Sequence, residues 1–180
     1  MKRVFVLVAV GAALAAGVSA SSRLHAATAR PAAAGEQQSG FILTPPAAPA
    51  GQMVLYGHIK KVTRKGGHYE VRFDPAWFTS GVTASRAKLE DTGSSDVPND
   101  NYVIEEGHRQ LTYLLPTTAR ITVLVNNGTK GINSTPITAA ELGRIVNGGP
   151  HRKLFEPLSS GIWIRIRIDT IRELDQQYQP

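Results

Sequence analysis

The sequence predicts an α+β fold rich in β-structure, with six or seven short strands in an antiparallel sheet and two short helices. The first observation is an alternation near the carboxy terminus, where every second residue from Ile162 to Ile168 is isoleucine. Trp163, Arg165 and Arg167 occupy the positions between, and this period of two is typical of a half-buried strand. The second observation is the regular spacing of short apolar runs between turn-forming residues. Strands this numerous can curl into a partly closed barrel, which would protect the sheet edges.

The folded part is expected to begin at Met53, where an Ala- and Pro-rich composition gives way to mixed apolar and basic residues. One strand is predicted from Met53 to Thr63 and a second from His68 to Phe73, where apolar and charged residues alternate. Gly66 and Gly67, between the two strands, are free to adopt the positive φ angles of a tight turn. The two strands are therefore expected to form a β-hairpin.

The middle of the chain is predicted to hold one helix and three further strands. Residues 74–78 are expected to leave the hairpin. Thr83 can cap a short helix that runs to Asp91, and Gly93 is expected to stop it. After a polar loop at residues 93–100, strands in meander spacing are predicted at residues 101–105, 108–115 and 119–125.

A second helix is predicted after a loop rich in Asn, Gly and Thr at residues 126–136. Thr138 and Glu141 form a capping box, in which the hydroxyl and the carboxylate each accept a hydrogen bond from an otherwise unpaired backbone amide. Gly148 and Gly149 are expected to end this helix. An irregular segment from His151 to Ser160 then leads to the isoleucine strand.

The first 52 residues are expected to provide export and a linker. Lys2 and Arg3 precede an apolar run that ends in the small-residue cleavage site Val18–Ala20, so residues 1–20 are predicted to be a secretory signal. A retained membrane anchor is the alternative, but the run is shorter than the ~20 residues that a spanning helix needs. Residues 21–52 are predicted to be a disordered Ala/Pro-rich tether, and residues 53–180 the globular domain.

Composition excludes several classes of site. The chain has 180 residues, a formal charge of +6 and no cysteine, so disulfides, thiolate metal sites and a cysteine nucleophile are ruled out. From Met53 onward, 16 Lys and Arg face 13 Asp and Glu. Nucleic-acid binders concentrate more positive charge than this, so no nucleic-acid partner is expected. No cofactor or catalytic motif is recognised, and no metal site is assigned.

Several fragments resemble a family of small exported bacterial proteins without an assigned activity. They are Tyr56–Lys61, Phe73–Ala76 with Ser80–Gly81 and Ala84, Glu90–Asp91, Val97–Ile104, His108–Pro116, Trp163–Ile168 and Asp175–Pro180. The resemblance covers about residues 55–180. It implies a bacterial envelope protein with a single β-rich domain, and it implies no catalytic residue.

Carboxylates are the residues that could support catalysis or a hard cation. Asp96 and Asp100 share a loop with Asn99, which suits either a calcium ion or ordinary turn hydrogen bonding, and the latter is favoured. A hydrolase of the cell envelope that uses Asp or Glu as acid and base would need two carboxylates about 5–10 Å apart in one cleft. Four acids are candidates for such a pair: Asp74, Glu90, Asp91 and Asp100.

The predicted binding surface is the outward face of the isoleucine strand. Trp163 can stack on a ring, and Arg165 and Arg167 can pair with a carboxylate or phosphate. The alternative is a solvated strand face whose arginines pair with acids on neighbouring strands. The sequence therefore predicts an uncharacterised exported domain that binds or modulates an envelope component, such as an anionic polymer, a glycan or a protein. An inhibitor or adaptor that pairs through an exposed sheet edge is a third alternative.

Overall fold

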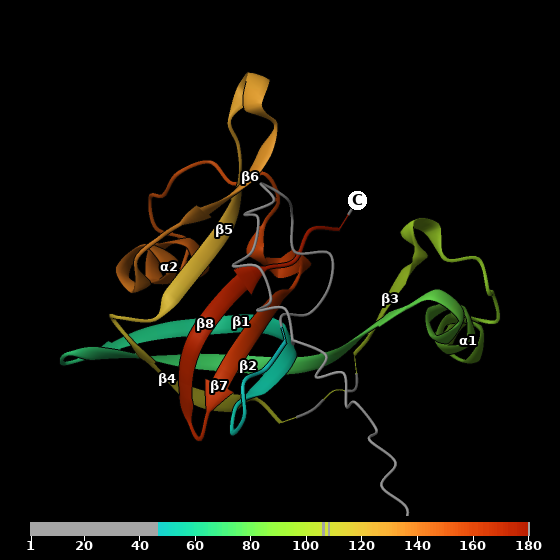
Figure 1. Cartoon of the computed structure of the whole chain (residues 1–180), viewed down its shortest axis with the longest axis horizontal. Coiled ribbons are helices and arrows are strands. Elements are labelled where there is room, and N and C mark those ends of the chain that lie inside the picture. The colour runs from blue at the N-terminus through green and yellow to red at the C-terminus, as the bar shows by residue number, and fades with distance from the viewer. Residues whose placement is uncertain (1–46, 106, 108, 180) are drawn as a thin grey trace, which may run out of the picture. The chain divides into compact units, whose positions relative to one another are not determined.

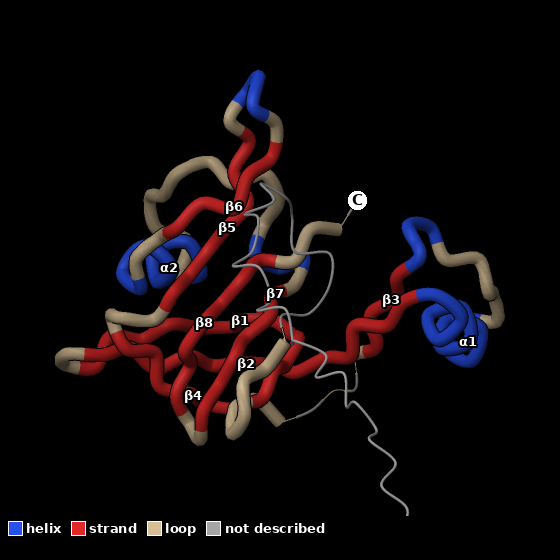
Figure 2. The backbone as a smooth tube through the Cα atoms, in the orientation of Figure 1, coloured by secondary structure: helices blue, strands red, loops and turns tan. Residues whose placement is uncertain are grey.

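The computed structural model describes residues 47–105, 107 and 109–179. The predicted signal (residues 1–20), most of the tether, Glu106 and His108 lie outside the described residues. The described residues belong to one compact unit, which is β-rich, with eight strands and two α-helices (Figures 1 and 2). The strands are β1 (Met53–Lys65), β2 (His68–Ser80), β3 (Asn101–Ile104), β4 (Leu111–Pro116), β5 (Arg120–Asn126), β6 (Ile132–Pro136), β7 (Ile162–Arg167) and β8 (Thr170–Gln176), and the helices are α1 (Gly81–Thr92) and α2 (Ala139–Val146).

The predicted hairpin is confirmed, with β1 and β2 antiparallel about a turn at Gly66 and Gly67. The expectation that residues 74–78 leave the hairpin is wrong, because β2 continues to Ser80 and Pro75 lies opposite Gly57. A Cβ atom at Gly57 would collide with the backbone carbonyl oxygen of Asp74. The missing side chain therefore lets the two strands stay together past the proline.

The sheet is mixed rather than purely antiparallel. Its strand order is β3-β2-β1-β7-β8-β5-β6, and β4 pairs with both β2 and β8. The pairs that β8 forms with β4 and β5 are parallel, and the other pairs are antiparallel. The predicted meander of three strands is also wrong, since β3 and β4 both pair with β2, whereas β5 pairs with β6 and β8 (Figure 1).

Two strands were missed by the sequence prediction. β6 lies inside the predicted loop at residues 126–136, and β8 follows β7 after a tight turn at Ile168 and Asp169. The expected isoleucine row therefore ends at Ile166. Ile162, Ile164 and Ile166 are buried as predicted, but Ile168 is 84% exposed and has a positive φ of 56°.

Both helices occur where they were predicted. α1 begins at Gly81 rather than Thr83, and Gly93 ends it in the left-handed conformation as expected. The Thr138 hydroxyl accepts a hydrogen bond from the Glu141 amide at 3.2 Å, which confirms this half of the capping box. The Glu141 carboxylate instead accepts hydrogen bonds from the guanidinium of Arg152 at 2.5 and 3.0 Å.

Buried apolar residues form two separate clusters. The larger is the main core, where β7 contributes its isoleucines and α2 contributes Leu142. The smaller lies on the other face of β7 and contains Tyr56, Ala76 and Trp163, with Phe78 packed against it. Both faces of β7 are thus covered near Trp163, which explains why the burial of this strand is nearly continuous.

Candidate functional site

Trp163 does alternate with the isoleucines, but the expectation that it faces solvent is wrong. Only 6% of its surface is exposed. Its ring centroid lies 5.0 Å from that of Tyr56 and 5.7 Å from that of Phe78. Its Nε1 donates a hydrogen bond to Oε1 of Gln177 at 2.5 Å, so the polar edge of the indole is satisfied inside the protein. Trp163 is therefore a structural element of the second cluster.

The two arginines of the predicted binding face differ from each other. Arg165 forms an ion pair with Glu173 on β8 and donates to the carbonyl oxygen of Ala47 at 3.3 Å. Glu173 also binds Arg120 at 2.8 Å, and Arg120 reaches the buried carboxylate of Asp175 at 2.8 Å. The alternative of cross-strand ion pairs thus describes Arg165.

Arg167 is exposed, and it forms no ion pair with any residue in the described part of the chain. It is the member of the predicted trio that remains available to a ligand. Because Trp163 is covered and Arg165 is neutralised by Glu173, the three side chains do not form one open surface.

A small apolar hollow lies beside Trp163 and is here called the aromatic pocket. It has a volume of about 210 Å³ and is lined by Val54, Leu55, Tyr56, Pro75, Ala76, Trp77, Phe78 and Trp163. The continuation of β2 past Pro75 brings Trp77 and Phe78 to it. Trp77 is 59% exposed, so a large aromatic ring is accessible to solvent at the edge of a preformed apolar hollow. Such a combination is typical of ligand sites.

Tyr56 fixes one wall of the aromatic pocket. Its hydroxyl donates a hydrogen bond to the carbonyl oxygen of Ser160 at 2.9 Å and accepts one from Nε2 of Gln179 at 2.9 Å. Burial raises the pKa of Tyr56 to about 12, although the hydrogen bond from Gln179 opposes this shift. The phenol is therefore neutral throughout the physiological range. It is a hydrogen-bonded wall rather than an acid or a base.

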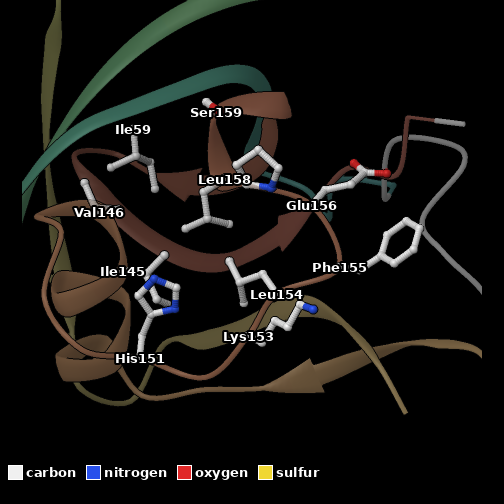
Figure 3. Close-up of a pocket in the computed structure, with 11 residues that line it drawn as sticks. Ile59, Ile145, Val146, His151, Lys153, Leu154, Phe155, Glu156, Leu158 and Ser159 are labelled. Carbon is white, nitrogen blue, oxygen red and sulfur yellow. The ribbon is translucent and has the colours of Figure 1, made fainter. Parts of the chain in front are cut away.

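A larger cavity of about 480 Å³ lies between α2 and the segment that leads to β7 (Figure 3). Its lining is mostly apolar, with Ile145, Leu154 and Leu158 around the centre. His151 and Glu156 lie at opposite ends of it (Figure 3). Burial raises the pKa of Glu156, and the hydrogen bond that it accepts from the Gln179 amide only partly offsets this. Glu156 is the single carboxylate among the lining residues.

The four acids named as candidates for a catalytic pair have separate surroundings in the structure. Asp74 pairs with Lys60 at 3.1 Å and Glu90 with Arg86 at 2.9 Å, while Asp91 accepts a hydrogen bond from Tyr102. Asp100 follows Asn99 in a turn where both residues have positive φ. This geometry fits the turn interpretation of the loop. Among the described residues, no group of three His, Cys, Asp or Glu side chains could hold a metal ion.

Comparison with protein-family models, with curated proteins and with solved structures finds no significant match. The resemblance to small exported bacterial proteins therefore stays a prediction from the sequence. None of the helices in the described ranges is long and apolar enough to cross a membrane.

Sequence reasoning singled out Trp163 but missed the residues that gather around it. The adjacent aromatic residues Trp77 and Phe78, just after Pro75, were the available signal. They were assigned to a segment leaving the hairpin, so their approach to Tyr56 and Trp163 was not anticipated.

Proposed function

We propose that this protein is an exported binding domain of the bacterial cell envelope whose aromatic pocket receives one ring of an envelope glycan. The observation that carries the proposal is the exposed Trp77 beside a hollow walled by Tyr56, Phe78 and Trp163. A volume of about 210 Å³ suits a single ring rather than a whole cofactor. Aromatic faces offer a flat apolar surface against which the C–H face of a sugar can pack.

The arrangement of strands supports the same proposal. β1, β2, β4, β8 and β7 pair in a ring, which is closed by the single residue pair between Leu114 and Thr170. We propose that this ring of five strands is the partly closed barrel expected from the sequence. Small, partly open barrels present loops and strand faces to oligosaccharides and oligonucleotides.

The proposal is tested by measuring the affinity of the purified domain for soluble glycan fragments from bacterial cell walls. Trp77→Ala is expected to weaken binding about tenfold, since removing an aromatic contact at a binding centre costs about 1–2 kcal/mol. Val82→Ala is the matched control, because Val82 is an exposed apolar residue on α1 that does not line the aromatic pocket. Equal affinity of wild type and Trp77→Ala, or no binding of any glycan by the wild type, would contradict the proposal.

A hydrolase that acts on envelope polymers is the second candidate. One observation favours it, and one opposes it, because a single carboxylate lines the larger cavity whereas acid–base hydrolysis of this kind needs two. Glu156 is a partly desolvated carboxyl at the edge of the larger cavity, and its raised pKa suits a general acid. The binding experiments distinguish the two functions if the length of the glycan fragments is measured after incubation with the protein. Shortened fragments that appear with wild type and not with Glu156→Gln would favour the hydrolase, whereas intact glycan would favour binding alone.

A further inference from the structure

The turn between β7 and β8 holds a β-branched residue in a left-handed backbone conformation, which such residues rarely adopt. Ile168 has a φ of 56°, and a branched Cβ makes this left-handed conformation costly, so glycine or asparagine is the usual choice. The same isoleucine is 84% exposed, so burial does not offset the cost. A residue at a turn tip that is both strained and exposed to solvent does not stabilise the fold, and this indicates a role in function.

Other exposed apolar side chains gather at this end of the sheet. Leu114 is 41% exposed, and its amide donates to the carbonyl oxygen of Asp169 in the turn at 2.8 Å. Leu111, 39% exposed, begins the same strand, and Met53, 57% exposed, lies opposite Ile166 at the end of β7. Of the eight large apolar residues that are exposed in the described chain, Ile168 lies in this turn, and Leu114 and Met53 pair with residues within two positions of it. Figure 1 shows this turn at the lower end of β7 and β8, beside β4.

Exposed arginines flank this turn on β7 and β8, and another precedes β4, the strand that pairs with β8. Arg167 directly precedes Ile168, Arg172 lies three residues beyond Asp169 on β8, and Arg109 precedes β4. All three are exposed and form no ion pair with a described residue. The acid nearest in the chain is Asp169, within the turn itself. An exposed isoleucine with Arg167 before it and Arg172 on the following strand is the complement of an anionic lipid surface.

We propose that the β7–β8 turn docks on an anionic lipid bilayer, with Ile168 entering the boundary between headgroups and acyl chains and the arginines contacting the headgroups. The docking is peripheral and needs no spanning segment. It is independent of the aromatic pocket, because none of the residues of this tip lines that pocket.

Vesicle sedimentation of the purified protein tests this proposal, with neutral phosphatidylcholine vesicles compared with vesicles that also contain phosphatidylglycerol. Wild type is expected to bind the anionic vesicles and not the neutral ones. Ile168→Asn is expected to lower the partition coefficient about tenfold, because the loss of a buried isoleucine costs more than 1 kcal/mol. Arg167→Gln and Arg172→Gln should each lower it about fivefold, the effect of ~1 kcal/mol per cation near the surface.

The variant design separates docking from folding. Asparagine tolerates the left-handed conformation, so Ile168→Asn should unfold at the same or a higher denaturant concentration than wild type. Val82→Asn removes an equally exposed apolar side chain from α1 and should bind vesicles as wild type does. Trp77→Ala should also bind them normally, which distinguishes failure of this proposal from failure of the glycan proposal.

Three outcomes would overturn the docking proposal. The first is an absence of wild-type binding to anionic vesicles. The second is unchanged binding of Ile168→Asn, which would mean that charge alone acts. The third is that a soluble anionic polymer binds wild type and Ile168→Asn equally and displaces the protein from vesicles. The basic residues would then be assigned to the polymer rather than to a lipid surface.

Discussion

Replacement of Gly161 by alanine is expected to lower the free energy of unfolding by about 2–6 kcal/mol, from overpacking together with a strained backbone. An added Cβ would overlap the hydroxyl and ring of Tyr56, which is 3% exposed and is held between Phe78 and Trp163. The φ of Gly161 is 119°, a conformation that residues with a side chain rarely adopt. Urea denaturation measures the effect.

Gly67→Ala is the matched control for this glycine. Gly67 lies in the β1–β2 turn without a positive φ, and no atom other than those of its neighbours in the chain lies within 4 Å of a Cβ built there. Its replacement should leave stability unchanged or raise it by about 0.4–1 kcal/mol, because the unfolded chain loses freedom. If the two alanine variants were equally stable, the close contact between Gly161 and Tyr56 would be contradicted.

Trp163→Ala is expected to cost about 3–5 kcal/mol, the range for a large aromatic residue removed from a core. The indole is 6% exposed and packs on two other rings, and its loss would also leave Oε1 of Gln177 without its donor. Chemical denaturation with a fluorescence-independent signal, such as far-ultraviolet circular dichroism, measures this loss.

Trp77→Ala provides the comparison within the same aromatic pocket. Because Trp77 is 59% exposed, its removal should change stability by only about 0.5 kcal/mol. Trp163→Phe should fall between the two, since it keeps an aromatic ring but leaves the Gln177 amide oxygen unpaired. Equal losses for Trp163→Ala and Trp77→Ala would contradict the different roles assigned to them.

Local signals in the sequence predicted the elements whose causes are local. Gly66 and Gly67 set the hairpin, Gly93 stops α1, and Thr138 caps α2, and each of these residues acts on backbone within a few positions. The alternation around Ile164 placed the buried side of β7 correctly for the same reason, because side chains on a strand alternate whatever its neighbours are.

Pairing between distant strands was not predictable in this way. β8 was missed because a register shift opposite Arg165 and Ile166 interrupts its alternation. Its parallel pairing with β4 and β5 depends on strands more than 40 residues earlier in the chain. The antiparallel meander was therefore predicted from the spacing of neighbouring strands, whereas the actual pairing depends on strands that are distant in the chain.

The candidate site was predicted only in part for a related reason. Alternation shows that Trp163 faces away from the isoleucines, but it does not show what covers that second face. The cover is supplied by the continuation of β2 past Pro75, which depends on the contact between Gly57 and the backbone of Asp74. The pairing of Arg165 with Glu173 likewise required the position of β8.

The burial of Trp163 as the inner wall of the aromatic pocket is the claim on which the proposed function depends. The sequence holds two tryptophans, so the variant Trp77→Phe leaves Trp163 as the only indole fluorophore. Its emission is expected to be blue-shifted and largely protected from quenching by iodide in the folded protein. Red-shifted emission that iodide quenches as fully as in the denatured chain would contradict the account.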